Sequence, residues 1–195
     1  MESRASDGPR LTPVKIVIAG GFGVGKTTFV GAISEIEPLR SEAVMTQESA
    51  GIDELFEGNT KTTTTVAMDF GRISLKGNLV LYLFGTPGQD RFHFMWHELS
   101  KGAIGAVVLV DTRRLEACFP AVDFFEKQGV PFLVAVNTFN GDKLHSLDEV
   151  ATALTINPSV PLLYCDARHR LQVQGALVQL VEHALTRALE GAAAS

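Results

Sequence analysis

The segment GGFGVGKTT, residues 20–28, combines four glycines with one lysine and two threonines. Backbone amides can surround a polyphosphate only where no side chain obstructs their approach, and glycine removes that obstruction. The order Gly20, four residues, Gly25, Lys26, Thr27 is the phosphate-loop pattern, in which the lysine meets the outer phosphates and the threonine hydroxyl binds Mg²⁺. We therefore expect an anion cradle, built from the amides of residues 23–27 and the positive end of a helix that starts near Lys26.

A strand and a helix must position this loop, and the flanking sequence predicts both. VKIVIAG, residues 14–20, is an apolar run broken only by Lys15, which is typical of a strand buried on both faces of a parallel sheet. Four further runs of this kind follow at 79–85, 104–111, 131–137 and 160–166. Between them, apolar residues recur at helical spacing, as over 115–125 and 177–188, where Pro120 requires a helix that has only just begun.

One segment breaks this alternation of strand and helix. Residues 62–75, TTTTVAMDFGRISL, are joined to the strand at 79–85 by the short KGN turn, which predicts an antiparallel edge strand. The fold class that follows is α/β: a mainly parallel six-stranded sheet with one antiparallel edge strand and helices on both faces.

Length and composition are those of one globular domain. The chain has 195 residues, of which 46% are apolar and 20% charged, and its apolar runs are too short to span a bilayer. We expect a domain over residues 14–190, a mobile polar leader at 1–13 and a tail at 191–195, in a cytoplasmic protein without direct membrane insertion. Cys118 and Cys165 show no metal-binding spacing and are expected to be reduced structural thiols.

The formal net charge of −5 makes nucleic acid a poor partner. The acidity is concentrated in residues 34–57, which hold seven carboxylates against Arg40. A solvated loop is the simpler interpretation of this run, and an electrostatic face for a basic partner is the functional one. Because long loops in compact domains are usually functional or mobile, we expect nucleotide or a partner to reorder it.

A second motif narrows the class of phosphate-binding protein. FGTPGQDRFHFMW, residues 84–96, resembles the D-x-x-G-Q segment of Ras-like small GTPases, and Asp90 and Trp96 continue it as Arf-type members do. Over residues 14–190 the chain resembles the actinobacterial conservon-type (CvnD-like) GTPases, relatives of the polarity GTPase MglA and of the Ras/Arf superfamily. The resemblance implies a Ras-like P-loop domain with Mg²⁺ as cofactor and GTP or GDP as the bound nucleotide. It also implies roadblock/LC7-type and sensor-kinase-like partners, able to recruit the protein to a membrane surface.

The resemblance assigns roles to individual residues. Gly88 would give its amide to the γ-phosphate, Gln89 would orient the attacking water, and Lys26 would neutralise phosphate charge. Thr27 and Thr65 would hold Mg²⁺, and the three threonines before Thr65 remain alternatives to it by register. The full set of nucleotide-binding residues would be Gly21, Phe22, Gly23, Val24, Gly25, Lys26, Thr27, Thr28, Asn137, Thr138, Asn140, Ala167 and Arg168.

The base is expected between two loops that follow later strands. NTFN, residues 137–140, occupies the place of the family's N-[KT]-x-D, and CDARHR, residues 165–170, occupies the place of S-A-K. By resemblance, Asn137 would tie the loops together, the Ala167 amide would reach the base carbonyl, and the stem of Arg168 would cover the ring.

Three residues depart from the family pattern. Asn140 replaces an aspartate that accepts two hydrogen bonds from guanine; an amide accepts only one, a mismatch of roughly 1 to 3 kcal/mol, whereas xanthine would fit. Gly85 replaces the aspartate that helps to hold Mg²⁺ through water, and Phe22 replaces a glycine near the γ-phosphate. We therefore expect slow hydrolysis, with Arg91 or Arg40 as the arginine nearest in sequence to compensate in cis.

The sequence thus predicts a small GTP-binding switch that hydrolyses GTP slowly and whose nucleotide state controls partner binding in signalling. Two alternatives stay open. A non-catalytic nucleotide-binding adaptor in a signalling complex would tolerate all three departures. A small-molecule P-loop kinase would need a lid and an acceptor pocket, for which the chain offers no arginine-rich insertion.

Overall fold

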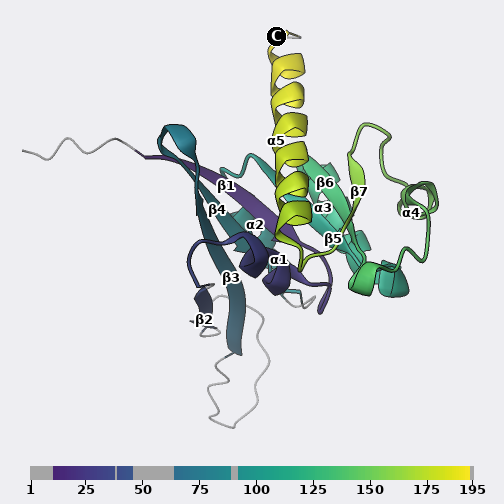
Figure 1. Ribbon diagram of the computed structural model, residues 1–195, viewed down its shortest axis with the longest axis horizontal. Coiled ribbons are helices and arrows are strands. Elements are labelled where there is room, and N and C mark those ends of the chain that lie inside the picture. Colours follow the sequence, from purple (N-terminus) through teal and green to yellow (C-terminus); the bar gives the residue numbers. More distant parts are fainter. Residues whose placement is uncertain (1–10, 38, 46–63, 89–91, 194–195) are drawn as a thin grey trace, which may run out of the picture.

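The computed structural model describes residues 11–37, 39–45, 64–88 and 92–193, with the backbone alone for 39–45 and 64–67. One seven-stranded sheet spans the domain in the order β2-β3-β4-β1-β5-β6-β7 (Figure 1). Its strands are β1 (Thr12–Ala19), β2 (Leu39–Met45), β3 (Thr64–Ser74), β4 (Leu79–Gly85), β5 (Gly105–Val110), β6 (Phe132–Asn137) and β7 (Leu162–Cys165). β3 runs antiparallel to both of its neighbours, and all other pairings are parallel. The predicted α/β class, mainly parallel with one antiparallel strand, is confirmed.

Strand β2 is the difference from the expected six strands. It lies inside the acidic segment that the sequence suggested was a loop, and it pairs antiparallel with β3. The antiparallel strand β3 is therefore covered, and β2 takes the edge of the sheet. The segment LRSEAVM lacks the apolar run of the central strands, because an edge strand gains from backbone pairing with its single neighbour rather than from burial on two faces.

Helices cover both faces of the sheet, as predicted. They are α1 (Lys26–Ile33), α2 (Phe94–Ser100), α3 (Phe119–Gln128), α4 (Leu147–Leu154) and α5 (Arg170–Ala193), with short 3₁₀ segments η1 (Lys76–Asn78), η3 (Thr112–Cys118) and η4 (Phe139–Gly141). Successive residues of β1 point to opposite faces. Ile16 and Ile18 pack with α1 and α5, whereas Val17 and Ala19 pack with α2, α3 and α4. The result is two apolar layers around a sheet buried on both sides.

The ends of three elements and the surroundings of the two cysteines can be compared with the sequence predictions. α3 begins at Phe119 with Pro120 in its first turn, where no amide hydrogen bond is lost. β1 starts at Thr12 and α5 continues to Ala193, so regular structure extends beyond the expected 14–190 domain at both ends. Cys118 and Cys165 are free and buried, and burial raises the pKa of each thiol to about 12, as expected of structural cysteines.

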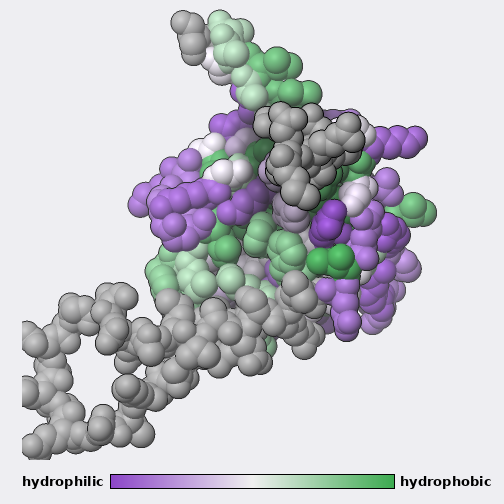
Figure 2. Space-filling view, turned by 90° about the vertical axis from the view of Figure 1, so that its left-hand side faces the viewer, coloured by the Kyte–Doolittle hydropathy of each residue, from purple (hydrophilic) through white to green (hydrophobic). Residues whose placement is uncertain are grey.

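The C-terminal half of α5 projects past the sheet (Figure 1). Its side chains Val181, Leu185 and Leu189 are exposed there, and Figure 2 shows hydrophobic surface on this projecting end. Among the helices of the described residues, none combines the length and hydrophobicity required to cross a membrane.

Candidate functional site

The glycine-rich loop joins β1 to α1 at the carboxyl edge of the parallel strands. Gly25 has a left-handed φ of 107°, and a Cβ built there would lie 2.7 Å from Asn137 Nδ2. Both the backbone conformation and the lack of space exclude a side chain at this position. α1 begins at the next residue, so its unpaired first-turn amides lie at the end of the loop, as the phosphate-loop pattern predicts.

Lys26 is folded into this loop and only 8% exposed. Its Nζ donates to the carbonyls of Gly20 (2.8 Å) and Gly21 (2.7 Å). Burial lowers the pKa of the Lys26 ammonium to about 8, and the nearby carboxylate of Asp69 opposes this shift. An anion at the loop would therefore offset the desolvation of the ammonium and stabilise its charged form.

A cavity of about 410 Å³ opens beside the loop. It brings together six of the predicted nucleotide-binding residues, the glycine predicted for the γ-phosphate, and two residues that were not predicted. The lining residues are Phe22, Gly23, Gly25, Lys26, Thr27, Thr28, Gly88, Asp69 and Thr86. Segments from three parts of the chain, residues 22–28, Asp69 and residues 86–88, thus converge on the place expected for a polyphosphate.

Residues with oxygen atoms suited to Mg²⁺ are among those that line this cavity. Thr27 Oγ1, the predicted metal ligand, donates a hydrogen bond of 2.6 Å to Asp69 Oδ2. Thr86 Oγ1 is buried and has no hydrogen-bond partner among the described residues. The described part of the chain holds no group of three or more histidine, cysteine or carboxylate side chains able to bind a metal. A hydroxyl and one carboxylate fit Mg²⁺, which takes its remaining ligands from water and phosphate.

Gly88 lies directly over the phosphate loop. A Cβ built at Gly88 would be 2.7 Å from Lys26 Nζ and 2.9 Å from Phe22 Cα, so only glycine allows this approach. The Phe22 ring is 67% exposed. Nearby, Trp96 is buried and its Nε1 donates to the carbonyl of Pro87 at 3.3 Å, which couples the only tryptophan of the chain to the residue before Gly88.

Arg114 is a site residue that the sequence analysis missed. Its Nη2 donates to the Phe22 carbonyl at 3.1 Å, and it also pairs with Asp111 at 3.6 Å. The available signal was the DTRR segment, because it follows a central parallel strand and so reaches the same edge of the sheet as the phosphate loop. Among arginines whose side chains are described, this guanidinium reaches the phosphate loop; the side chains of the predicted candidates, Arg91 and Arg40, lie outside the described part of the chain.

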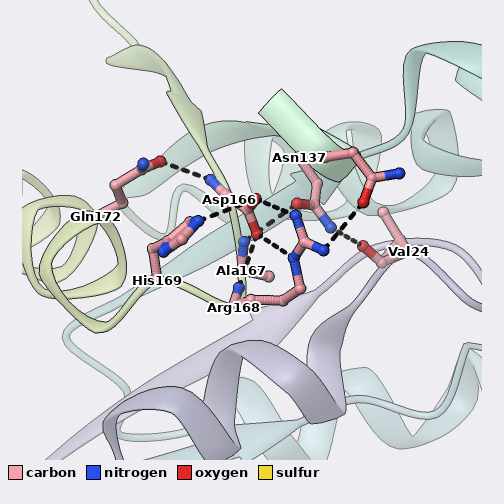
Figure 3. A network of polar contacts seen from close by, with 8 residues as sticks. Val24, Asn137, Asp166, Ala167, Arg168, His169 and Gln172 are labelled. Carbon is pink, nitrogen blue, oxygen red and sulfur yellow. Dashed lines mark hydrogen bonds and ion pairs between the residues drawn. The ribbon is translucent and has the colours of Figure 1, made fainter. Parts of the chain in front are cut away.

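Asn137 braces the two loops, as predicted. It is 6% exposed, and its Nδ2 donates to the Val24 carbonyl at 2.8 Å (Figure 3). Its Oδ1 accepts from the Ala167 amide at 3.2 Å. The Ala167 amide, which the resemblance assigned to a base carbonyl, is thus bonded to Asn137. A base carbonyl would have to share this amide with Asn137 Oδ1 or displace that oxygen. Thr138 lies beside this brace, buried, with its amide bonded to the Cys165 carbonyl at 3.2 Å.

The guanidinium of Arg168 is anchored within the protein. It is held by Asp166 through Nε (2.9 Å) and Nη2 (2.6 Å), as Figure 3 shows, and the packing of its stem over a base stays a prediction. Its Nη1 donates to Asn140 Oδ1 at 3.0 Å. The Arg168 guanidinium lowers the pKa of Asp166 to about 2, so this carboxylate stays ionised. The polar groups expected at a base therefore form one network within the protein.

Some predicted residues cannot be placed. Gln89 and Arg91 lie outside the described residues. Thr65 lies in β3 opposite Val44, and Arg40 lies in β2 opposite Asp69, but only their backbones are described. The metal role of Thr65 and the catalytic role of Gln89 therefore stay predictions.

Two known proteins resemble this chain in sequence. The chain is 29% identical over 126 residues to the uncharacterized protein MJ1339 of Methanocaldococcus jannaschii, covering 64% of this chain and 69% of that protein. It is 24% identical over 186 residues to human Ras-related protein Rab-7b, covering 89% and 83% of the two chains.

Solved structures of the iron transporter FeoB from T. maritima share the fold. The FeoB G domain superposes with a TM-score of 0.58 at 17% identity, covering 89% of this chain and 99% of that one. The FeoB cytosolic domain in a GDP form gives 0.62 at 18% identity, covering 90% and 64%. The fold is thus that of P-loop G domains. The family model described as "conserved hypothetical ATP binding protein" matches residues 18–187, and the chain belongs to that family.

Proposed function

We propose that this protein is a small GTP-binding switch that binds GTP or GDP with Mg²⁺ and hydrolyses GTP slowly. The observation that carries the proposal is the buried Lys26 ammonium, held in a glycine loop at the start of α1 and facing a cavity of about 410 Å³. That arrangement is suited to the outer phosphates of a nucleotide. The G-domain fold and the likeness to Rab-7b support the GTPase class.

The proposed chemistry is attack of water on the γ-phosphate. Lys26 and the loop amides would neutralise the charge that spreads over the phosphate oxygens, and Gln89 would orient the water. Bound Mg²⁺ would add charge neutralisation at the β- and γ-phosphates. Phe22, whose backbone meets Gly88 and whose ring is exposed, would limit access of a partner's arginine, which supports the proposal of slow turnover.

The contact between Arg168 and Asn140 favours a base other than guanine. Because Asn140 Oδ1 accepts from Arg168, the amide nitrogen is the group left for a ligand, and that nitrogen is a donor. Guanine presents donors at this place, whereas xanthine presents a carbonyl and adenine a ring acceptor. A xanthine or adenine nucleotide is therefore the second candidate, and the description of the family as ATP-binding supports adenine.

The signalling role rests on the sequence resemblance. We propose a roadblock/LC7-type protein and a sensor-kinase-like complex as partners, with nucleotide state controlling their binding and the membrane surface reached through them. In the alternative, the protein is a non-catalytic nucleotide-binding adaptor. Turnover separates the two: if phosphate release stays at background with the roadblock partner present and Gln89→Leu changes nothing, the adaptor is correct.

The first experiment is to identify the nucleotide that co-purifies with the protein and then to titrate GTP, GDP, ATP and XTP with and without Mg²⁺. Lys26→Met should abolish binding. Lys101→Met is the matched control, since Lys101 is an exposed lysine just after α2 whose Nζ pairs with Glu98 at 2.6 Å. Folded wild-type protein that binds none of the four nucleotides at about 1 mM would refute the proposed function.

A further inference from the structure

Gly85, at the end of β4, leaves a space that a carboxylate from the neighbouring strand fills. A Cβ built at Gly85 would lie 3.0 Å from Asp69 Cβ and 3.2 Å from Asp69 Oδ2. Asp69 belongs to β3, where the adjacent Phe70 pairs with Phe84 of β4. The side chain of Asp69 therefore stands where a residue larger than glycine at position 85 would project.

The same carboxylate is part of the phosphate-loop cavity. Asp69 Oδ2 accepts the hydroxyl proton of Thr27 at 2.6 Å. The negative charge of Asp69 acts to raise the pKa of the Lys26 ammonium, against the lowering by burial. Among the described residues that line the cavity, Asp69 is the only carboxylate. The contacts of Asp69 are thus with the loop that would hold phosphate and metal, although the two lie 42 positions apart in the sequence.

We propose that Asp69 is the carboxylate that positions Mg²⁺ in this protein, taking from β3 the place that Gly85 leaves empty on β4. The inference rests on the proposed function, because it concerns the metal that would accompany the nucleotide. On this proposal, the metal carboxylate is supplied from position 69 instead of position 85 and has not been lost.

The chemistry of the contact supports this role. A threonine hydroxyl has one proton and two lone pairs, and donating the proton to Asp69 leaves both lone pairs of Thr27 Oγ1 for a cation. The carboxylate also supplies negative charge beside that hydroxyl. Mg²⁺ prefers oxygen ligands and usually keeps several of its bound waters, through which a nearby carboxylate can hold it. Asp69 is accordingly a positioning residue that orients and polarises Thr27, as partners of metal ligands do.

The test measures Mg²⁺ dependence rather than turnover. For wild type, Asp69→Asn and the control Asp123→Asn, the affinity for a fluorescent guanine nucleotide would be titrated from EDTA to excess Mg²⁺. Asp69→Asn keeps an acceptor for Thr27 but removes the charge, and Asp123 is an exposed carboxylate on α3. We expect Asp69→Asn to weaken apparent Mg²⁺ affinity about 10- to 100-fold, with nucleotide affinity in EDTA not reduced. Asp123→Asn should behave as wild type.

A carboxylate swap provides the second arm. Asp69→Gly removes the side chain that crowds position 85, and combining it with Gly85→Asp should recover much of the Mg²⁺ affinity lost in Asp69→Gly alone. Unchanged Mg²⁺ dependence in Asp69→Asn overturns the proposal, and so does a swap that binds Mg²⁺ no better than Asp69→Gly. If wild type binds none of GTP, GDP, ATP and XTP either with or without Mg²⁺, the proposed function itself has failed, which is a distinguishable result.

Discussion

Asn137 joins the phosphate loop to the loop after β7 by two buried hydrogen bonds, and Asn137→Ala removes both. Its Nδ2 donates to the Val24 carbonyl at 2.8 Å, and its Oδ1 accepts from the Ala167 amide at 3.2 Å. Val24 and Ala167 are 2% and 1% exposed, so solvent does not replace the lost partner at either backbone group. We expect Asn137→Ala to destabilise the fold and to separate the two halves of the proposed nucleotide site.

The size of the effect follows from the two groups left unpaired. Each buried polar group without a partner costs about 1 to 3 kcal/mol, so the substitution should lower the free energy of unfolding by about 2 to 6 kcal/mol. In a domain of this length, 1 kcal/mol corresponds to about 2 to 4 °C in melting temperature, which gives a fall of about 4 to 24 °C.

Thermal unfolding followed by circular dichroism measures this fall, with Asn157→Ala as the control. Asn157 Oδ1 also accepts a backbone amide, that of Ser159 at 2.9 Å, but this bond is exposed. Its loss should cost less than about 0.5 kcal/mol. If Asn137→Ala melts within 2 °C of Asn157→Ala, a difference below the smallest expected, the reasoning from buried, unpaired groups is refuted.

Three further outcomes are expected. Asn140→Asp should raise the affinity for GTP relative to XTP by about 5- to 150-fold, the equivalent of a 1 to 3 kcal/mol mismatch, and an unchanged ratio in competition binding would contradict it. Because burial lowers the pKa of Lys26 to about 8 from 10.5, the unfolded chain binds more protons between these values. Stability of the nucleotide-free protein should therefore rise with pH across that window, and urea unfolding should show this rise disappear in Lys26→Met. Because Trp96 Nε1 donates to the Pro87 carbonyl next to Gly88, Trp96 fluorescence should change when a nucleotide binds. Gly88→Ala places a Cβ 2.7 Å from Lys26 Nζ and should suppress that change; a response of wild-type size would count against the packing of Gly88 on the loop.

Local pattern was sufficient for much of the fold. Five apolar runs predicted the parallel strands, because burial on both faces of a parallel sheet demands them, and the threonine-rich segment with its short turn predicted the antiparallel one. Pro120 predicted the start of its helix because only the first turn tolerates a missing amide. Strand β2 could not be predicted, since LRSEAVM owes its structure to pairing with β3 and not to its own pattern.

The candidate site divides in the same way. Gly25, Lys26 and Thr27 belong to a stretch of nine consecutive residues whose pattern depends only on local backbone conformation. The sequence alone therefore determined where a phosphate would be held. The contacts of Asp69 with Thr27 and of Arg114 with Phe22 join residues 42 and 92 positions apart. Only the tertiary structure decided those contacts, because the order and register of the strands set which side chains meet at the edge of the sheet, and no local pattern encodes that order.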